Sequence, residues 1–146
     1  MSSLSIFDAR KEVGLLAKGL RFSLPHVSAD SSLTPDSRMQ LMHYRQRPSF
    51  GAIVESAGAG IIAFGLISLV DARQGEWELD QIVSHPDMRR QGLGALVVGS
   101  LEKLARRAAA DVLIAESTAT VGARSMYAKL GFLPVGESDK FVKQLP

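Results

Sequence analysis

The chain has 146 residues, of which 46% are hydrophobic, and this length and composition fit one domain with a full core. Lys and Arg number 17 against 15 Asp and Glu, a surplus too small to indicate a nucleic-acid partner. The absence of cysteine excludes disulfides, thiolate metal sites and a catalytic cysteine, and three histidines without ligand spacing argue against a bound metal.

The first 48 residues predict helices and loops. A helix is expected over residues 8–20 with Asp8 as its N-cap, and a second over residues 34–46, which begins at a Thr-Pro pair. Between the two, residues 21–32 are rich in Pro, Ser and Asp, and this composition predicts a loop.

No segment of the sequence predicts a targeting signal or a membrane span. The N-terminus lacks a basic region followed by an apolar run, so a signal peptide is not expected. The apolar stretch from Ala57 to Val70 has 14 residues and is rich in glycine, whereas a spanning helix needs roughly 20 residues. We therefore expect a soluble, cytoplasmic protein without a membrane partner.

The middle of the chain changes to a strand pattern. Three apolar runs, Ala52–Val54, Ile61–Val70 and Trp77–Val83, are separated by short breaks that contain glycine. Runs rich in Ile, Val and Phe with such breaks predict antiparallel strands joined by hairpins.

Helices and strands alternate in the last third. From Leu93 to Ala108 apolar residues recur at three- and four-residue steps, which predicts an amphipathic helix. We then expect a buried strand over residues 111–117, a helix over residues 122–131 and a last strand over residues 140–146. This order indicates an α/β fold with a mixed sheet covered by helices.

A loop with two glycines and two arginines opens the helix that begins near Leu93. A helix N-terminus presents unpaired N–H groups and a positive dipole end, and Gly92 and Gly94 allow a ligand to approach the backbone. Arg89 and Arg90 add positive charge, so the loop is suited to a phosphate or pyrophosphate. The alternative is a tight turn with solvated arginines. The spacing fits neither a Walker loop nor a dinucleotide-binding loop.

Two motifs in this half of the chain resemble the GCN5-related N-acetyltransferase (GNAT) family. The loop carries the family's acyl-coenzyme A pattern at Arg89, Gly92 and Gly94, after a His-Pro-Asp strand exit. The later segment GARSMYAKLGFLPVG, residues 122–136, resembles the family's second signature. The resemblance implies a single domain over residues 1–146, with a cofactor-binding core from residue 49 onward and a variable helical part before it, which often shapes the acceptor site.

The resemblance implies a mixed, mostly antiparallel sheet, splayed between a fourth strand at residues 77–84 and a fifth at residues 112–116, and flanked by helices. Acetyl-CoA is then the acyl donor, with its pantetheine arm in the wedge and its pyrophosphate on the glycine loop. The cofactor-binding residues implied in this way are Ile82, Val83, Ser84, Arg89, Arg90, Gln91, Gly92, Leu93, Gly94, Ala95, Thr120 and Tyr127. Two of them depart from the family pattern, because Thr120 stands where Asn is common and Arg90 where Gly is frequent.

The chemistry implied by the resemblance is acyl transfer from a thioester to an amine. Tyr127 matches the family's frequent general acid, which protonates the departing thiolate; the alternative is a tyrosine used for packing. Glu78 lies eleven residues before Arg89, where some family members carry a glutamate base. Strand alternation places Asp80 on the same face as Glu78, so either carboxylate, or a water chain without a dedicated base, fits this role.

The sequence therefore predicts an N-acetyltransferase that moves an acetyl group from acetyl-CoA to a primary amine by direct attack on the thioester. The acceptor is expected to be a small-molecule or peptide amine. A non-catalytic acyl-CoA sensor or interaction domain is the alternative from another class, and a transferase for proteins or aminoacyl-tRNA is a third. The family resemblance also allows a homodimer.

Overall fold

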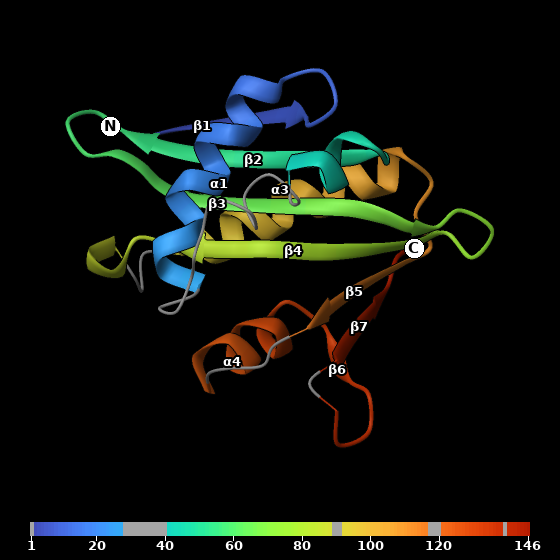
Figure 1. The fold of residues 1–146 in the computed structure, drawn as a ribbon. Coiled ribbons are helices and arrows are strands. Elements are labelled where there is room, and N and C mark those ends of the chain that lie inside the picture. Colours follow the sequence, from blue (N-terminus) through green and yellow to red (C-terminus); the bar gives the residue numbers. More distant parts are fainter. Residues whose placement is uncertain (1, 28–40, 89–91, 117–120, 139) are drawn as a thin grey trace.

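The computed structural model of the chain describes residues 2–27, 41–88, 92–116, 121–138 and 140–146. Its strands are β1 (Ser2–Asp8), β2 (Ser49–Ser56), β3 (Gly60–Asp71), β4 (Glu76–Ser84), β5 (Val112–Glu116), β6 (Leu133–Pro134) and β7 (Lys140–Gln144). These strands form one sheet in the order β1-β2-β3-β4-β5-β7-β6 (Figure 1).

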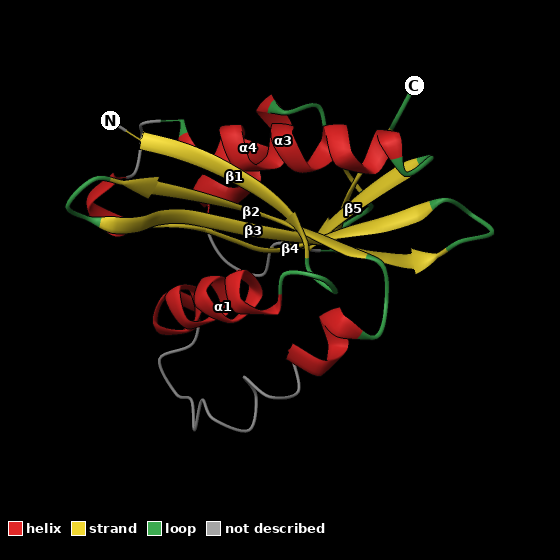
Figure 2. Cartoon of the chain, turned by 90° about the horizontal axis from the view of Figure 1, so that it is seen from above, coloured by secondary structure: helices red, strands yellow, loops and turns green. Residues whose placement is uncertain are grey.

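Helices cover both faces of this sheet. The helices are α1 (Val13–Val27), α3 (Leu93–Arg107) and α4 (Val121–Lys129), with a 3₁₀ turn at Pro86–Met88 and a short helical stretch at residues 41–45. Seen from above, α1 and the short stretch lie on one side of the sheet, and α3 and α4 lie on the other (Figure 2). The fold is therefore the helix-covered α/β sheet that the sequence predicts.

The pairing of β4 with β5 makes the sheet mixed and leaves it splayed. All other neighbouring strands pair antiparallel, whereas β4 and β5 run parallel. Their register covers only Glu76–Leu79 of β4 against Val112–Ala115 of β5, although β4 continues to Ser84. Figure 1 shows β4 and β5 diverging toward their C-terminal ends. The mostly antiparallel sheet, open between these two strands, is confirmed.

Two apolar layers hold the helices on the sheet. Between the sheet and α3, the buried residues include Val97 and Leu101 of the helix and Leu113 of β5. Between the sheet and α1, they include Leu16 and Phe64. The amphipathic helix predicted from Leu93 is confirmed, because its buried positions follow helical spacing and it ends one residue earlier than expected, at Arg107.

The N-terminal segment differs from the prediction of helices and loops. Ser2–Asp8 forms β1, which pairs antiparallel with β2 along its whole length. Asp8 does not cap a helix directly, because its carboxylate accepts a hydrogen bond from the Arg10 amide at 2.9 Å and α1 begins only at Val13. Asp8 therefore closes a turn between the strand and the helix.

The loop predicted for residues 21–32 is wrong over its first part. α1 continues to Val27, past Pro25, and residues 28–32 lie outside the described part of the chain. Leu16, Leu20 and Ser23 are fully or almost fully buried on the face of α1 that packs on the sheet. This packing outweighs the local turn signal of Pro and Ser, since helix stability in proteins comes mainly from tertiary contacts.

Of the helix predicted over residues 34–46, residues 41–45 are helical, and residues 34–40 lie outside the described part of the chain. The strand and helix predictions after residue 48 are confirmed with small changes in bounds. The three middle runs lie within β2, β3 and β4, and the later elements correspond to β5, α4 and β7. β6 was not predicted, because Leu133–Pro134 has only two residues and pairs with β7 alone. Such a short edge strand carries no alternation that a sequence pattern could reveal.

Gly19→Ala is expected to destabilise the fold by about 1–3 kcal/mol, because α1 lies directly on the ring of Phe64. A Cβ at Gly19 would stand 2.1 Å from Cε1 of that ring. Gly14 is the matched control in the same helix, since a Cβ there meets no atom within 4 Å, and Gly14→Ala is expected to stabilise by up to about 1 kcal/mol. Urea unfolding measures both; equal effects at the two sites would contradict the close approach.

Candidate active site

A β-bulge in β4 lies where the sheet opens. The two-residue step from Phe64 to Leu66 on β3 is opposed by a three-residue step from Asp80 to Val83 on β4, so β4 carries one extra residue. Bulges bend a strand and disturb its ladder. Here the bend begins at the first residue beyond the stretch paired with β5. The bulge therefore helps to separate β4 from β5 and creates a wedge between them.

The predicted cofactor residues Ile82, Val83 and Ser84 lie on β4 beyond Leu79, at this wedge. Val83 and Ser84 are in register with β3 on one side, and β5 does not pair with this part of the strand on the other. The edge of β4 that faces the wedge thus offers backbone groups to a bound ligand.

The start of α3 provides a second set of backbone groups. Gly92 precedes the helix with φ of 75°, a left-handed conformation that glycine adopts without strain. A Cβ at Gly92 would meet no atom within 4 Å, so the space beside the loop is open. The amides of Leu93, Gly94 and Ala95 belong to the first turn, which has no acidic side chain. This helix start is therefore suited to an anion.

Gly94 has a packing role that the sequence did not indicate. A Cβ on Gly94 would stand 2.6 Å from Sδ of Met126, so the first turn of α3 lies against α4. Glycine at this position lets the two helices approach without displacing the methionine. The same contact fixes the glycine loop next to the helix that carries Tyr127.

Tyr127 is buried in α4 beside the core of the sheet. Its side chain is 5% exposed, and its ring lies 5.5 Å from that of Phe132 and 5.7 Å from that of Phe141. Burial, and to a lesser extent the charge of Asp80, raises the pKa of the Tyr127 phenol above its ordinary value of 10. The phenol therefore stays protonated at neutral pH and can donate a proton.

Glu78 and Asp80 lie on the same face of β4, as alternation predicts. Trp77 and Leu79 are buried in the core under α3, so the two acidic side chains point to the opposite face, which α1 covers. Ser68 of β3 is in register with Glu78 and donates a hydrogen bond to Asp80, from Oγ to Oδ2 at 3.0 Å. The carboxylates are thus neighbours within one polar cluster.

Asp80 has a strongly altered acidity. The pKa of its carboxyl group is raised from 3.8 to about 7, mainly by burial and also by the nearby charge of Glu78. Hydrogen bonds from the hydroxyls of Ser68 and Tyr44, and the charge of Arg47, act in the opposite direction. A carboxylate with this pKa can accept a proton at neutral pH and release it again.

Most of the residues predicted for the site lie within the described part of the chain, and four do not. Arg89, Arg90, Gln91 and Thr120 lie outside the described residues. Ser68 and Tyr44 were not predicted as site residues. A serine inside the apolar run of β3 was a usable signal, because a buried hydroxyl needs a partner, whereas nothing in the sequence marked Tyr44.

The described parts of the chain offer neither a metal site nor a membrane-spanning helix. The described residues contain no group of three or more His, Asp or Glu side chains that could hold a metal ion. No helix within the described ranges is long and apolar enough to span a membrane.

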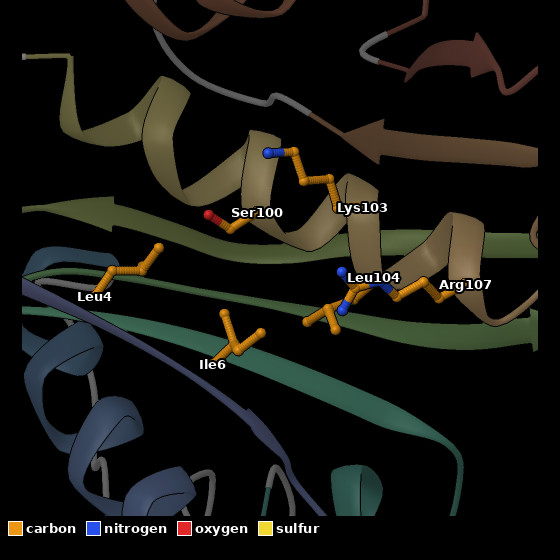
Figure 3. A pocket seen from close by; sticks show the side chains of 6 residues that line it. All are labelled: Leu4, Ile6, Ser100, Lys103, Leu104 and Arg107. Carbon is orange, nitrogen blue, oxygen red and sulfur yellow. The ribbon is translucent and has the colours of Figure 1, made fainter.

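A separate pocket of about 280 Å³ lies between β1 and α3 (Figure 3). Its lining residues are Leu4, Ile6, Ser100, Lys103, Leu104 and Arg107. In the sheet, β2 and β3 stand between β1 and β4, so this pocket is not part of the wedge.

A sheet splayed between two parallel strands, with a glycine-opened helix beside the gap, defines the acyl-CoA-dependent acyltransferase class of fold. The chain belongs to the GNAT family of acetyltransferases, whose sequence model matches residues 21–132. Comparison with the curated proteins finds no matching sequence.

Solved structures of the same family have the same fold. A GNAT-family protein from Desulfovibrio desulfuricans has a TM-score of 0.71 at 16% identity, over 98% of both chains. The ribosomal-protein-S18-alanine N-acetyltransferase of Escherichia coli has a TM-score of 0.70 at 20% identity, over 100% of this chain and 94% of that chain. The PaiA N-acetyltransferase of Thermoplasma acidophilum, in complex with coenzyme A, has a TM-score of 0.65 at 12% identity, over 98% and 99%.

Proposed function

We propose that this protein transfers an acetyl group from acetyl-CoA to a primary amine by direct attack of the amine on the thioester. The observation that carries the proposal is the wedge itself, where β4 beyond Leu79 loses its pairing with β5. Asp80 and Tyr127 stand close enough at this point for the charge of one to affect the pKa of the other. A proton acceptor and a proton donor at one opening are what aminolysis of a thioester requires.

The chain's own groups fit acetyl-CoA in two places. The open edge of β4 offers backbone hydrogen bonds to the amides of the pantetheine arm, and the start of α3 offers N–H groups to the pyrophosphate. The residues proposed for these contacts are Ile82, Val83, Ser84, Arg89, Arg90, Gln91, Gly92, Leu93, Gly94, Ala95 and Thr120. When bound, the thioester supplies the acetyl group and a thiolate leaving group.

The reaction needs a proton acceptor for the amine and a proton donor for the thiolate. An amine with a pKa near 10 is almost wholly protonated at neutral pH, so it must lose a proton before it can attack. Glu78 and Asp80, the two acidic residues of β4 nearest the wedge, are the carboxylates proposed for this step. Tyr127, which stays protonated, is proposed to protonate the departing thiolate.

The acceptor is proposed to be a small-molecule or peptide amine. The name of the Escherichia coli neighbour gives an alanine of a ribosomal protein as its acceptor, so peptide N-termini are one class to screen. A sensor that binds acyl-CoA without turnover would bind the donor and release no thiol with any amine. Thiol release in an amine screen separates the two functions.

Gly92→Asp is expected to weaken the binding of acetyl-CoA at least tenfold, which tests the proposed donor site. Aspartate and asparagine tolerate the left-handed conformation of Gly92 better than most residues, so both variants should fold. Gly92→Asn adds a side chain of the same size without the charge and is expected to weaken binding less. Isothermal titration calorimetry of the wild type and both variants measures their affinities for acetyl-CoA. The Asp variant should bind more weakly than the Asn variant, because its charge repels a phosphate.

Gly58→Asp is the control for a charge placed elsewhere. Gly58 also has a positive φ, of 88°, and open space around it, but it lies in the turn between β2 and β3. This variant should bind acetyl-CoA as the wild type does. If the wild type fails to bind acetyl-CoA, the proposed function is wrong; if both Gly92 variants bind normally, the pyrophosphate is held elsewhere.

A further inference from the structure

Asp80 is the first residue of β4 beyond the stretch paired with β5. Leu79 is the last residue of the strand in register with β5, and the bulge begins at the next residue. Asp80 therefore stands at the apex of the wedge, where the backbone of β4 first becomes available to a ligand. Glu78 lies two residues earlier, about 7 Å away along the strand, inside the stretch paired with β5.

Two buried hydroxyl groups hold the carboxylate of Asp80. Ser68 is 1% exposed and donates its hydrogen bond across the strand pair at 3.0 Å. Tyr44 is 4% exposed and also donates a hydrogen bond to Asp80, from the short helical stretch at residues 41–45. A half-buried carboxylate with two donors has a defined orientation, and the residues that orient it come from two separate segments.

We propose that Asp80, rather than Glu78, takes the proton from the acceptor amine, and that Ser68 and Tyr44 are positioning residues that hold its carboxylate at the apex of the wedge. This inference rests on the proposed acetyl transfer. The ammonium group gives one proton to Asp80, and the nitrogen lone pair forms the C–N bond as the C–S bond breaks. Tyr127 gives its proton to the sulfur and regains one from the nitrogen through water, and Asp80 releases its proton to solvent.

The surroundings of Asp80 suit this exchange of protons. The titratable, charged and hydrogen-bonding groups that act on it are Glu78 of β4, Ser68 of β3, Tyr44 and Arg47 of the segment before β2, and Tyr127 of α4. Burial and the neighbouring carboxylate favour the protonated form, and the hydroxyls and the guanidinium favour the ionised form. The balance leaves Asp80 able to change charge near neutral pH, which a base that must turn over requires.

The first test needs neither donor nor acceptor. Carbon-detected NMR of the full chain follows the carboxyl carbon of Asp80 through a pH titration. The midpoint is expected near pH 7 in the wild type, lower in Glu78→Gln and higher in Ser68→Ala and Tyr44→Phe. Opposite shifts from the two kinds of variant would show that the hydroxyls hold the ionised carboxylate, and the turnover measurements below test its part in catalysis. A midpoint near 4, or one that the variants leave unchanged, would overturn the proposal.

The second test measures turnover with named amines. Thiol release from acetyl-CoA is followed with butylamine, spermidine and a peptide with an N-terminal alanine, for the wild type, Asp80→Asn and Glu78→Gln. Asp80→Asn is expected to lower the rate about 100-fold or more with unchanged binding of acetyl-CoA in a calorimetric titration. Glu78→Gln should keep most of the activity and move the acidic limb of the pH profile to lower pH.

The outcomes separate this inference from the function on which it rests. If the wild type binds no acetyl-CoA, both the proposed acetyl transfer and the role of Asp80 are wrong. Normal binding and turnover in Asp80→Asn leaves the acetyltransferase standing and removes Asp80 as the base. A loss of turnover in Glu78→Gln, with the Asp80 midpoint unmoved, assigns the proton to Glu78 and likewise overturns the proposal.

Discussion

Tyr127→Phe is expected to lower the rate of acetyl transfer about 100-fold or more, with little effect on the fold or on acetyl-CoA binding. The substitution removes only the hydroxyl, and the ring keeps its contacts with Phe132 and Phe141. Without a proton donor, the sulfur must leave as a free thiolate, which the loss of a general acid makes slower by this order of magnitude. Steady-state thiol release with a saturating amine measures the loss.

Tyr44→Phe is the matched control, because Tyr44 is the only other tyrosine in the chain. It also removes a phenolic hydroxyl, but one on the opposite face of the sheet, where the hydroxyl donates a hydrogen bond to Asp80. This variant should shift the pH profile instead of removing activity. If Tyr127→Phe retains full turnover, its hydroxyl has only a packing role and the thiolate leaves without a donor.

The proposed donor site could be indicated from the sequence, because most of its residues are close together in the chain. Gly92 and the helix that begins at Leu93 form a local unit whose conformation depends on the glycine and on the helix start. Alternation along β4 was also sufficient to place Glu78 and Asp80 on one face. In both cases the geometry follows from the chain itself, without knowledge of its neighbours.

The polar cluster around Asp80 could not be predicted, because it depends on the register between strands. Ser68 is in register with Glu78, yet its hydroxyl reaches Asp80 next to the bulge. Tyr44 comes from a segment whose path over the sheet no local pattern specifies. The sequence could not therefore distinguish the two carboxylates, although their surroundings differ in the structure.

The N-terminal errors have a related cause. In β1 the apolar residues Leu4 and Ile6 remain 40% and 47% exposed, so the strand is held mainly by its backbone pairing with β2. Edge pairing of this kind leaves little hydrophobic signal. In α1 the signal was present but was outweighed by the turn-like composition of residues 21–27.

Asp80→Asn is expected to stabilise the protein at pH 8 by up to about 4 kcal/mol, while it removes activity. The pKa of Asp80 is raised from 3.8 to about 7 by folding, so between these values the folded state binds a proton that the unfolded state has lost. Stability from this group is thus fully present below pH 3.8, falls by about 1.4 kcal/mol per pH unit, and reaches its minimum above pH 7. An amide does not ionise, so the variant lacks this decline.

Urea unfolding of the wild type and Asp80→Asn across this pH range measures the difference, because groups that do not interact with Asp80 contribute equally to both proteins. The two curves should nearly meet at pH 4 and separate steadily up to pH 7; parallel curves would mean that Asp80 ionises in the folded protein as it does in water. A separation of the two stability curves would also support a functional role for Asp80. A half-buried carboxylate that lowers stability at neutral pH, in a place where an amide would fit, is expected where the ionised group takes part in chemistry.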